Sequence, residues 1–167
     1  MELDGGVMAK VKFTGFQEYM RKMEKMYGHS EELCTEALKA ACAVIGNAQK
    51  EAIYGIPTDP RRYVDGMRRG ILPEAKQALI DSYGIAPVRS KNFVYNRKTG
   101  FDGYNNIVTK RWPKGQPNDM VARSVESGTS FLPPHKFMDK AAKAAQAEAE
   151  TAMQDAIDKA VNRLWGN

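Results

Sequence analysis

Few residues of this sequence combine the types and spacing that catalysis requires. Glu126, Ser127 and His135 lie close together and supply an acid, a hydroxyl and a base, the components of a hydrolytic triad. A serine nucleophile, however, sits on a sharp turn with a characteristic glycine pattern, and its base is placed separately. The glycines around Ser127 do not follow that pattern. We therefore predict no acyl-transfer site in this segment.

The sequence also has few residues and no motif that would bind a metal ion or a cofactor. The sequence has two histidines and two cysteines, and it lacks HExxH, Cys-x-x-Cys, phosphate-loop and dinucleotide-binding motifs. Cys34 and Cys42 lie too far apart for a disulfide within a straight helix, so we interpret both as structural thiols. We predict that the protein is not an enzyme and has no catalytic residue, metal ligand or cofactor. The residue types leave one enzyme class open, a metal-dependent carboxylate nuclease.

Positive charge is concentrated in the middle of the chain. Residues 56–115 contain 12 basic and 5 acidic residues, whereas the segments before and after them are nearly balanced. Aromatic residues are interleaved with these charges, so phosphate contacts with base stacking are one interpretation. The other interpretation is a solvated set of loops. The residues that we assign as DNA-facing are Arg61, Arg62, Arg68 and Arg69, within a stretch at 56–73 that we expect to form a mobile basic loop.

Length and composition indicate one domain spanning residues 1–167. The chain is 43% hydrophobic, which suffices for the core of one ordinary domain and is little for two. No run approaches the roughly 20 apolar residues that cross a bilayer. Two cysteines are too few for a disulfide framework, and no secretory leader opens the sequence. We expect synthesis in a reducing cytoplasm and no membrane partner.

The first third of the chain predicts a short strand followed by two helices. Residues 9–13 alternate apolar side chains with lysines, as in a strand with one buried face. Helical spacing follows over residues 14–28, and again from Ser30 to Gly55. On the second helix, the predicted buried stripe consists of Cys34, Leu38, Ala41, Ile45, Ala48 and Ala52.

The middle of the chain predicts short strands joined by turns. Residues 74–82 fit either a helical turn or the approach to a strand, and residues 85–88 should be extended because Pro87 disfavours a helical conformation before it. Glycine-containing turns follow near residues 99–103. The predicted strands are 92–98, 107–112 and 120–126.

The last predicted element is a long, alanine-rich helix that begins near Pro134 and continues to about Trp165. About 30 residues at roughly 1.5 Å each give on the order of 45 Å, more than the body of a domain of this size should cover. We assign its first half to the chain's own core and its distal half to a subunit interface. The predicted interface residues are Ala149, Met153, Ala156, Ala160 and Leu164.

A turn connects the preceding segment to this helix. Gly128 lets the chain bend where a side chain would obstruct it, two prolines stiffen the approach to the helix, and Phe137 anchors the helix start. Glu126 pairs with an arginine, accepts hydrogen bonds from turn amides, or simply ends an exposed strand. The residues that we assign to this turn and helix start are Glu126, Gly128, Thr129, Pro133, Pro134 and Phe137.

Several of these segments occur in an order that resembles a known family. They are GFDGYN at 100–105, GQPNDMVARSVESGTS at 115–130 and PHKFMDKA at 134–141, with KVKFTGFQEYMRKMEKM and LIDSYGIAP upstream. The most specific part is Val-Glu-x-Gly-Thr, which ends at Thr129, followed by Phe137. Together they resemble the minor tail components of tailed bacteriophages, also described as head-tail joining, neck or tail-completion proteins.

The resemblance implies a structural subunit of a phage or prophage particle. The implied fold is α+β, with a small antiparallel β-sheet packed against N-terminal helices and one long C-terminal helix. The implied role is to join the DNA-filled head to the tail, as a homo-oligomeric ring that contacts the head connector and tail proteins. Non-specific contact with packaged DNA and a location in the virion neck or tail would follow. The alternative function is a nucleic-acid-binding module that uses the basic middle segment.

Overall fold

The described part of the chain is an α+β fold built around two long helices. The structure is a computed structural model, and it describes residues 16–62, 66–92 and 94–166. Its helices are α1 (Phe16–Gly28), α2 (Ser30–Tyr54), α3 (Pro73–Ser82), α4 (Asn118–Ser127) and α5 (Phe137–Trp165). Its strands are β1 (Tyr83–Ile85), β2 (Arg89–Lys91), β3 (Val94–Asn96) and β4 (Thr99–Phe101). The predicted fold class is confirmed, while the predicted strand at 9–13 lies outside the described residues.

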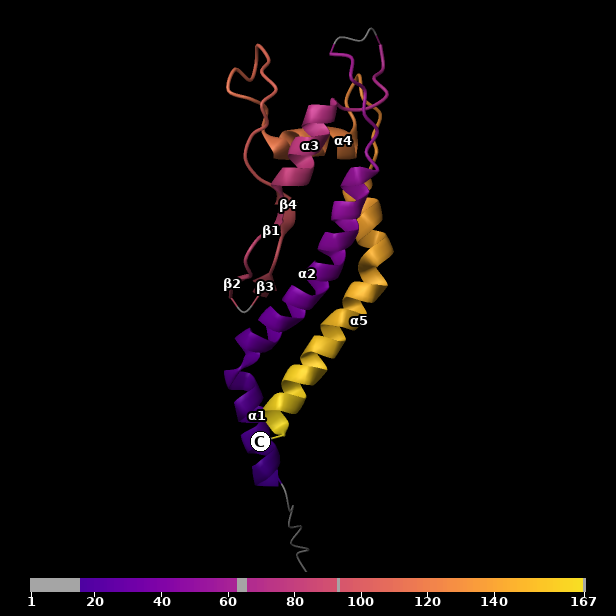
Figure 1. Ribbon diagram of the computed structural model, residues 1–167. Helices are drawn as coiled ribbons and strands as arrows, with labels where there is room; N and C mark the ends of the chain where they lie inside the picture. The colour runs from indigo at the N-terminus through magenta and orange to yellow at the C-terminus, as the bar shows by residue number, and fades with distance from the viewer. Residues whose placement is uncertain (1–15, 63–65, 93, 167) are drawn as a thin grey trace, which may run out of the picture.

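Helices α2 and α5 lie antiparallel and side by side, and we call this pair the rod (Figure 1). At one end of the rod, Arg163 on α5 forms ion pairs of 2.8 and 3.0 Å with Glu32 and Glu36 on α2. Helix α1 packs beside the same end. The buried positions in the middle of α5 are alanines, whose small side chains let the two helix backbones approach closely.

The buried face of α2 differs from the predicted stripe. Of the six predicted residues only Ala41 is fully buried, and the others are half-buried. The stripe is displaced because α2 is covered from more than one side, by α5, by α3 and by β1. Burial raises the pKa of the Cys42 thiol, as expected of a structural cysteine. The fully buried residues of α2 are Ala37, Ala41, Cys42, Gly46, Gln49 and Ile53.

The four strands form one narrow arm that runs alongside α2 (Figure 1). Strand β1 pairs antiparallel with β4, and β2 pairs antiparallel with β3. Gly46 brings α2 close to this arm, since a Cβ there would lie 2.7 Å from Cδ1 of Ile85. The Tyr83 hydroxyl donates a 2.8 Å hydrogen bond to Oε1 of the buried Gln49. The arm is therefore fixed to the rod by one close contact and one satisfied polar pair.

The main core lies where the far end of the rod meets α3 and α4. Ile53, Ile56, Leu79 and Val125 are its most deeply buried side chains. Burying a side chain of this size contributes roughly 1.5–3 kcal/mol. Phe137 adds the start of α5 to the same core, which confirms its predicted anchoring role.

Two predicted strands are wrong. Residues 120–126 belong to helix α4, whose buried residues Asn118, Val121, Ala122 and Val125 follow helical spacing. Residues 107–112 form an irregular loop in which the backbones of Thr109 and Trp112 bond to each other. The predicted strand at 92–98 contains the shorter strand β3, whose partner is β2 and not residues 107–112. The ambiguous segment 74–82 is helical, with Pro73 in its first turn.

Helix α5 ends where predicted but begins at Phe137, later than the predicted start near Pro134. Lys136, just before it, has a left-handed backbone conformation with φ 48°. Its amide donates to the carbonyl oxygen of Glu126 at 3.2 Å, so the chain is still turning at this point. Both prolines therefore precede the helix rather than open it.

Candidate assembly surface

The end of the molecule opposite α1 carries several loops packed around α3 and α4. We call this region the loop end, and it comprises α3, α4 and residues 56–62, 66–72, 105–116 and 128–132 (Figure 1). The predicted loop at 56–73 is anchored at both ends, because Ile56 and Ile71 are buried in the core. The Asp59 amide donates to Ile71 O at 2.7 Å, and the Ile71 amide donates to Pro57 O at 3.1 Å. Glycine is required at position 70, since a Cβ there would collide with the carbonyl group of Pro57.

A buried carboxylate organises the described part of this loop. Asp59 is only 3% exposed, and its oxygens accept hydrogen bonds from Nε and Nη2 of Arg61 at 2.9 and 2.8 Å. The backbone amides of Arg61 and Arg69 donate to the same carboxylate at 3.1 and 3.3 Å. These hydrogen bonds, chiefly those from the Arg61 side chain, hold the pKa of Asp59 well below its usual range.

The four arginines predicted to face DNA have different roles in the structure. Arg61 is paired with Asp59. The Nη2 of Arg68 donates to the backbone oxygens of Arg61 and Asp59 at 2.6 and 3.3 Å, so its guanidinium holds the loop together. Arg62 and Arg69 are exposed, and Arg62 lies 3.8 Å from Glu74. Two of the four side chains are therefore engaged in loop structure, and two are directed to solvent.

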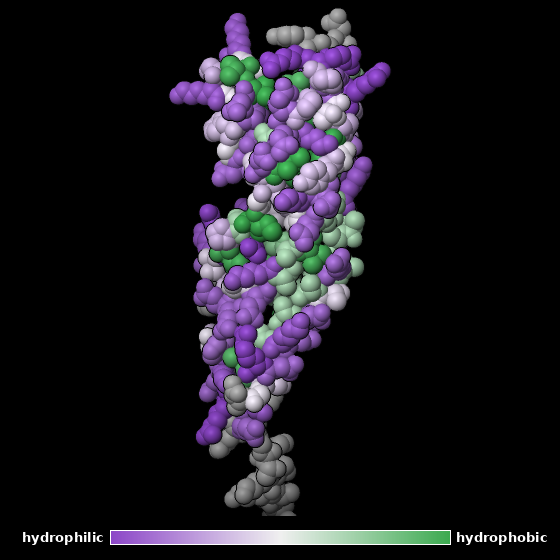
Figure 2. Space-filling model, in the orientation of Figure 1, coloured by the Kyte–Doolittle hydropathy of each residue, from purple (hydrophilic) through white to green (hydrophobic). Residues whose placement is uncertain are grey.

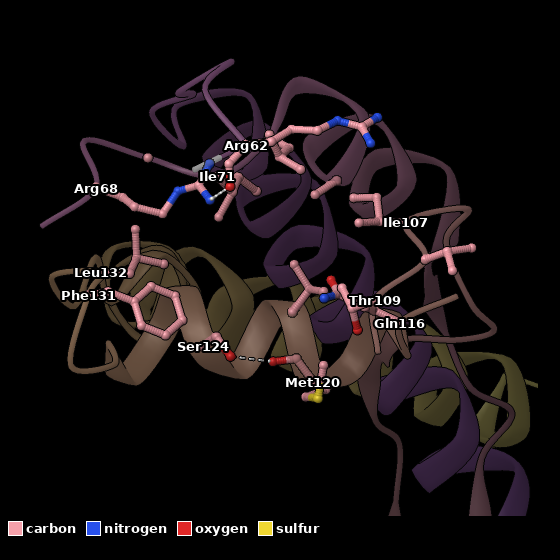
Figure 3. A pocket seen from close by; sticks show the side chains of 15 residues that line it. Arg62, Arg68, Ile71, Ile107, Thr109, Gln116, Met120, Ser124, Phe131 and Leu132 are labelled. Carbon is pink, nitrogen blue, oxygen red and sulfur yellow. Dashed lines mark hydrogen bonds between the residues drawn. The ribbon is translucent and has the colours of Figure 1, made fainter. Parts of the chain in front are cut away.

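An apolar groove opens between these loops and helices α3 and α4 (Figure 3). Its volume is about 310 Å³. Met120 and Ser124 of α4 lie along one side, and Arg62 and Arg68 lie across from them on the 56–72 loop. Most of the remaining lining is aliphatic or aromatic, and comprises Ile71, Leu72, Ile107, Val108, Phe131 and Leu132. The groove thus has a mixed lining, with aliphatic and aromatic side chains beside the polar Thr109, Gln116 and Ser124, and it has a basic rim.

Two side chains at the groove are exposed although they are strongly hydrophobic. Val108 is 65% exposed and Phe131 is 52% exposed. The position of Phe131 depends on both neighbouring loops, because its carbonyl oxygen accepts a 2.7 Å hydrogen bond from the Arg68 amide. Two exposed hydrophobic side chains beside an open groove make this surface a candidate for binding another molecule. Sequence reasoning missed this groove, because its walls come from four separate segments of the chain.

No protein-family model, curated protein or solved structure significantly matches this chain.

The turn before α5 places the Glu126 side chain against the first turn of the helix. The Glu126 carboxylate accepts hydrogen bonds from the Met138 and Asp139 amides, at 2.9 and 3.1 Å. It therefore caps the first turn of α5, where backbone amides lack helical partners and negative charge is favoured. Of the three roles that the sequence left open for Glu126, the structure shows the one in which its carboxylate accepts hydrogen bonds from backbone amides. Both carboxylate oxygens of Glu126 are engaged by amides of α5. The side chain therefore holds the start of the helix in place, and it is not paired with His135 as a catalytic triad would require.

Gly128, Thr129 and the following prolines shape the same turn. Gly128 has φ +75°, and a Cβ there would lie 2.8 Å from the Pro134 nitrogen and 3.0 Å from Leu132 O. The Thr129 amide donates to Leu132 O at 2.7 Å, which closes the turn that carries Phe131. Pro133 and Pro134 are exposed and connect this turn to the helix. The predicted need for glycine at position 128 is confirmed.

The residues predicted to form a subunit interface on distal α5 are largely covered by the chain itself. Ala149, Ala160 and Leu164 are buried, and Met153 and Ala156 are half-buried. The cause is that α2 is almost as long as α5 and lies against it along the rod. The expected overhang of α5 beyond its own domain is absent from the described structure. The stripe is therefore packed inside one copy.

Two further features of the described residues bear on function. These ranges contain no cluster of three or more His, Cys, Asp or Glu side chains placed to hold a metal ion. Within them, no helix has both the length and the apolar character needed to span a bilayer.

Proposed function

We propose that this protein is a structural subunit of a phage or prophage particle that acts at the head-tail junction, as one copy in a ring. The observation that carries the proposal is the open apolar groove at the loop end, with Val108 and Phe131 exposed beside it. A free monomer gains nothing from exposing such side chains, whereas an assembly subunit buries them against its neighbour.

The architecture gives independent support. The fold class expected from the resemblance to minor tail components is the one observed, including the long C-terminal helix. The rod is a rigid arm about 40 Å long, from its 25- and 29-residue helices at roughly 1.5 Å per residue. It separates the loop end from α1, so one copy presents two distant surfaces. Two distant surfaces allow one subunit to contact different neighbours.

The nucleic-acid-binding alternative has less support. Arg61 and Arg68 are held by contacts within their own loop, which leaves Arg62 and Arg69 of the four candidates directed to solvent. Two exposed arginines suit a non-specific contact with passing DNA better than a dedicated binding site. Tight binding of the monomer to short duplex DNA, weakening steeply with salt, would favour this alternative.

The proposed function is tested by deleting the coding sequence from the phage or prophage genome and imaging the particles that form. The expected result is filled heads and tails that fail to join, with joining restored by a plasmid copy of the wild-type chain. Intact infectious virions from the deletion strain would overturn the proposal. The matched control is a plasmid copy carrying Val94→Asp, a change at an equally exposed valine on β3, which should restore joining as well as the wild type.

A further inference from the structure

Helix α1 presents an apolar face to solvent. Met20 and Met23 are each 42% exposed, and Tyr27 is 77% exposed. Their spacing of three and four residues places all three on one side of the helix. Glu24 lies on the same side, one turn from Met20, whereas Arg21, Lys22 and Lys25 point elsewhere around the helix. The exposed face of α1 is thus a short apolar ridge that carries one negative charge.

This ridge and the groove at the loop end have complementary chemistry. The groove is lined by aliphatic and aromatic side chains, and its rim carries Arg62, with Arg69 exposed on the same loop. An amphipathic helix binds in such a groove through apolar residues at i, i+3 and i+7, the positions of Met20, Met23 and Tyr27. Glu24 would then lie toward the basic rim. Both exposed apolar surfaces would be buried by a single contact.

One copy of the chain cannot make this contact with itself. Helix α1 lies at one end of the rod and the groove at the other, with the 25 residues of α2 between them (Figure 1). Those residues span roughly 37 Å. In the described structure α1 packs chiefly against α5 and α2.

We propose that helix α1 of a second copy of this chain occupies the groove, so that copies associate head to tail. This proposal rests on the proposed function and names the contact through which a ring would form. A contact between two different surfaces of identical subunits closes into a ring when the rotation between copies allows it, and otherwise extends as a filament. Figure 2 shows small apolar areas at the loop end and a broader apolar area in the middle of the molecule, along the rod.

The first test disables each surface separately with an exposed residue whose change should leave folding intact. Val108→Asp places a charge in the groove, and its control is Val94→Asp, since the two valines are 65% and 64% exposed. Tyr27→Asp places a charge on the ridge, and its control is Tyr104→Asp, at a tyrosine that is 66% exposed and outside the groove. Sedimentation velocity at low salt should show association for the wild type and both controls, and monomers for Val108→Asp and Tyr27→Asp.

Mixing the two disabled variants gives the most specific outcome. The Tyr27→Asp protein keeps an intact groove and the Val108→Asp protein keeps an intact ridge. A 1:1 mixture should therefore form dimers that cannot extend, although each variant alone is monomeric. A symmetric contact between two like surfaces would give no such rescue.

A charge exchange tests the role assigned to Glu24. Glu24→Arg and Arg62→Glu should each weaken association by about tenfold, and the double variant should recover most of the loss. Arg62 is suited to this change because its pair with Glu74 is long and solvent-exposed. Circular dichroism spectra identical to the wild type would show that the variants are folded.

Three results would overturn the contact. These are a wild type that stays monomeric at about 1 mM and low salt, association insensitive to both Val108→Asp and Tyr27→Asp, or a mixture that fails to form dimers. Wild-type monomers that bind a purified tail protein through the groove would assign it to a foreign partner instead. The proposed function has a separate readout, because deletion of the chain can leave heads and tails unjoined even if this contact is absent.

Discussion

The rod and the loop end use hydrophobic side chains in opposite ways. On the rod, alanines such as Ala145 and Ala149 are buried between α5 and α2, so the apolar stripe is part of the chain's own core. At the loop end, Val108 and Phe131 remain exposed around a groove of about 310 Å³. The comparison teaches that an apolar stripe on a long helix does not by itself identify an interface. Exposure after folding is the feature that distinguishes a docking surface from a core.

The largest predicted effect concerns the rod. Ala160 is 0% exposed, so Ala160→Asp would bury a charge without a partner and should lower the free energy of unfolding by about 3 kcal/mol or more. Ala147→Asp is the matched control, since Ala147 lies on the exposed side of the same helix and the change should cost only the difference in helix propensity, about 0.7 kcal/mol or less. Urea denaturation measures both. Equal stability of the two variants would contradict the packing of the rod.

The next effect concerns the turn that positions Phe131. Gly128→Ala adds strain at φ +75° and a contact of 2.8 Å with the Pro134 nitrogen, so it should cost about 2–4 kcal/mol. Gly103→Ala is the control, because Gly103 has φ +67° but open space around its Cα. It should cost only about 1–2 kcal/mol. Thermal melts of both variants separate the cost of steric crowding from the cost of backbone strain. An equal loss of stability in both variants would show that crowding at Gly128 contributes nothing.

A smaller effect is expected at the cap that joins the loop end to the rod. Glu126→Ala removes both hydrogen bonds to the first turn of α5 and should cost about 1–2 kcal/mol. Glu148→Ala changes an exposed glutamate in the body of α5 and should be nearly neutral. Chemical denaturation compares the two, and a neutral Glu126→Ala would show that the cap contributes little.

The smallest effect is local to the loop that forms the groove rim. The pKa of Asp59 lies below its ordinary value of 3.8, so the stabilisation from its ionised form is complete at neutral pH. That contribution is lost as the pH falls below about 4 and through the lowered pKa. Asp59→Asn should loosen the loop at neutral pH while leaving the rod unchanged. Amide exchange rates at Arg61 and Arg69 report the change, and unaltered rates would show that the carboxylate does not organise the loop.

Sequence reasoning predicted the elements whose signals are local. The end of α1, the bounds of α2 and the end of α5 follow from apolar spacing and terminal glycines, although Ser30 makes no capping hydrogen bond in the described structure. Helix α4 was missed because residues 120–126 favour a strand by their β-branched valines, whereas their burial follows helical spacing. The predicted overhang of α5 is wrong because α2 is almost as long and lies against α5 along the rod. The fold class could be predicted from the sequence. The role of the alanine stripe could not, because α5 packs against α2 and buries the stripe within one copy.

The groove could not have been predicted in the same way. Its lining comes from four segments, and the two most exposed hydrophobic residues, Val108 and Phe131, each stand beside one other hydrophobic residue, Ile107 and Leu132, in a loop. Nothing in their spacing distinguishes an exposed side chain from a buried one. Glu126 shows the same limit, since its two hydrogen bonds to α5 exist only because the turn brings residues 126 and 138 together.

We propose that copies dock through the loop end and α1, while the alanine face of α5 belongs to the fold of each copy. Hydrogen-deuterium exchange of the monomeric Val108→Asp variant and of the associated wild type can be compared to test this proposal. Association should give new protection in α1, at 105–112 and at 129–132, with no change along 149–164. New protection confined to 149–164, with none at the groove, would contradict it.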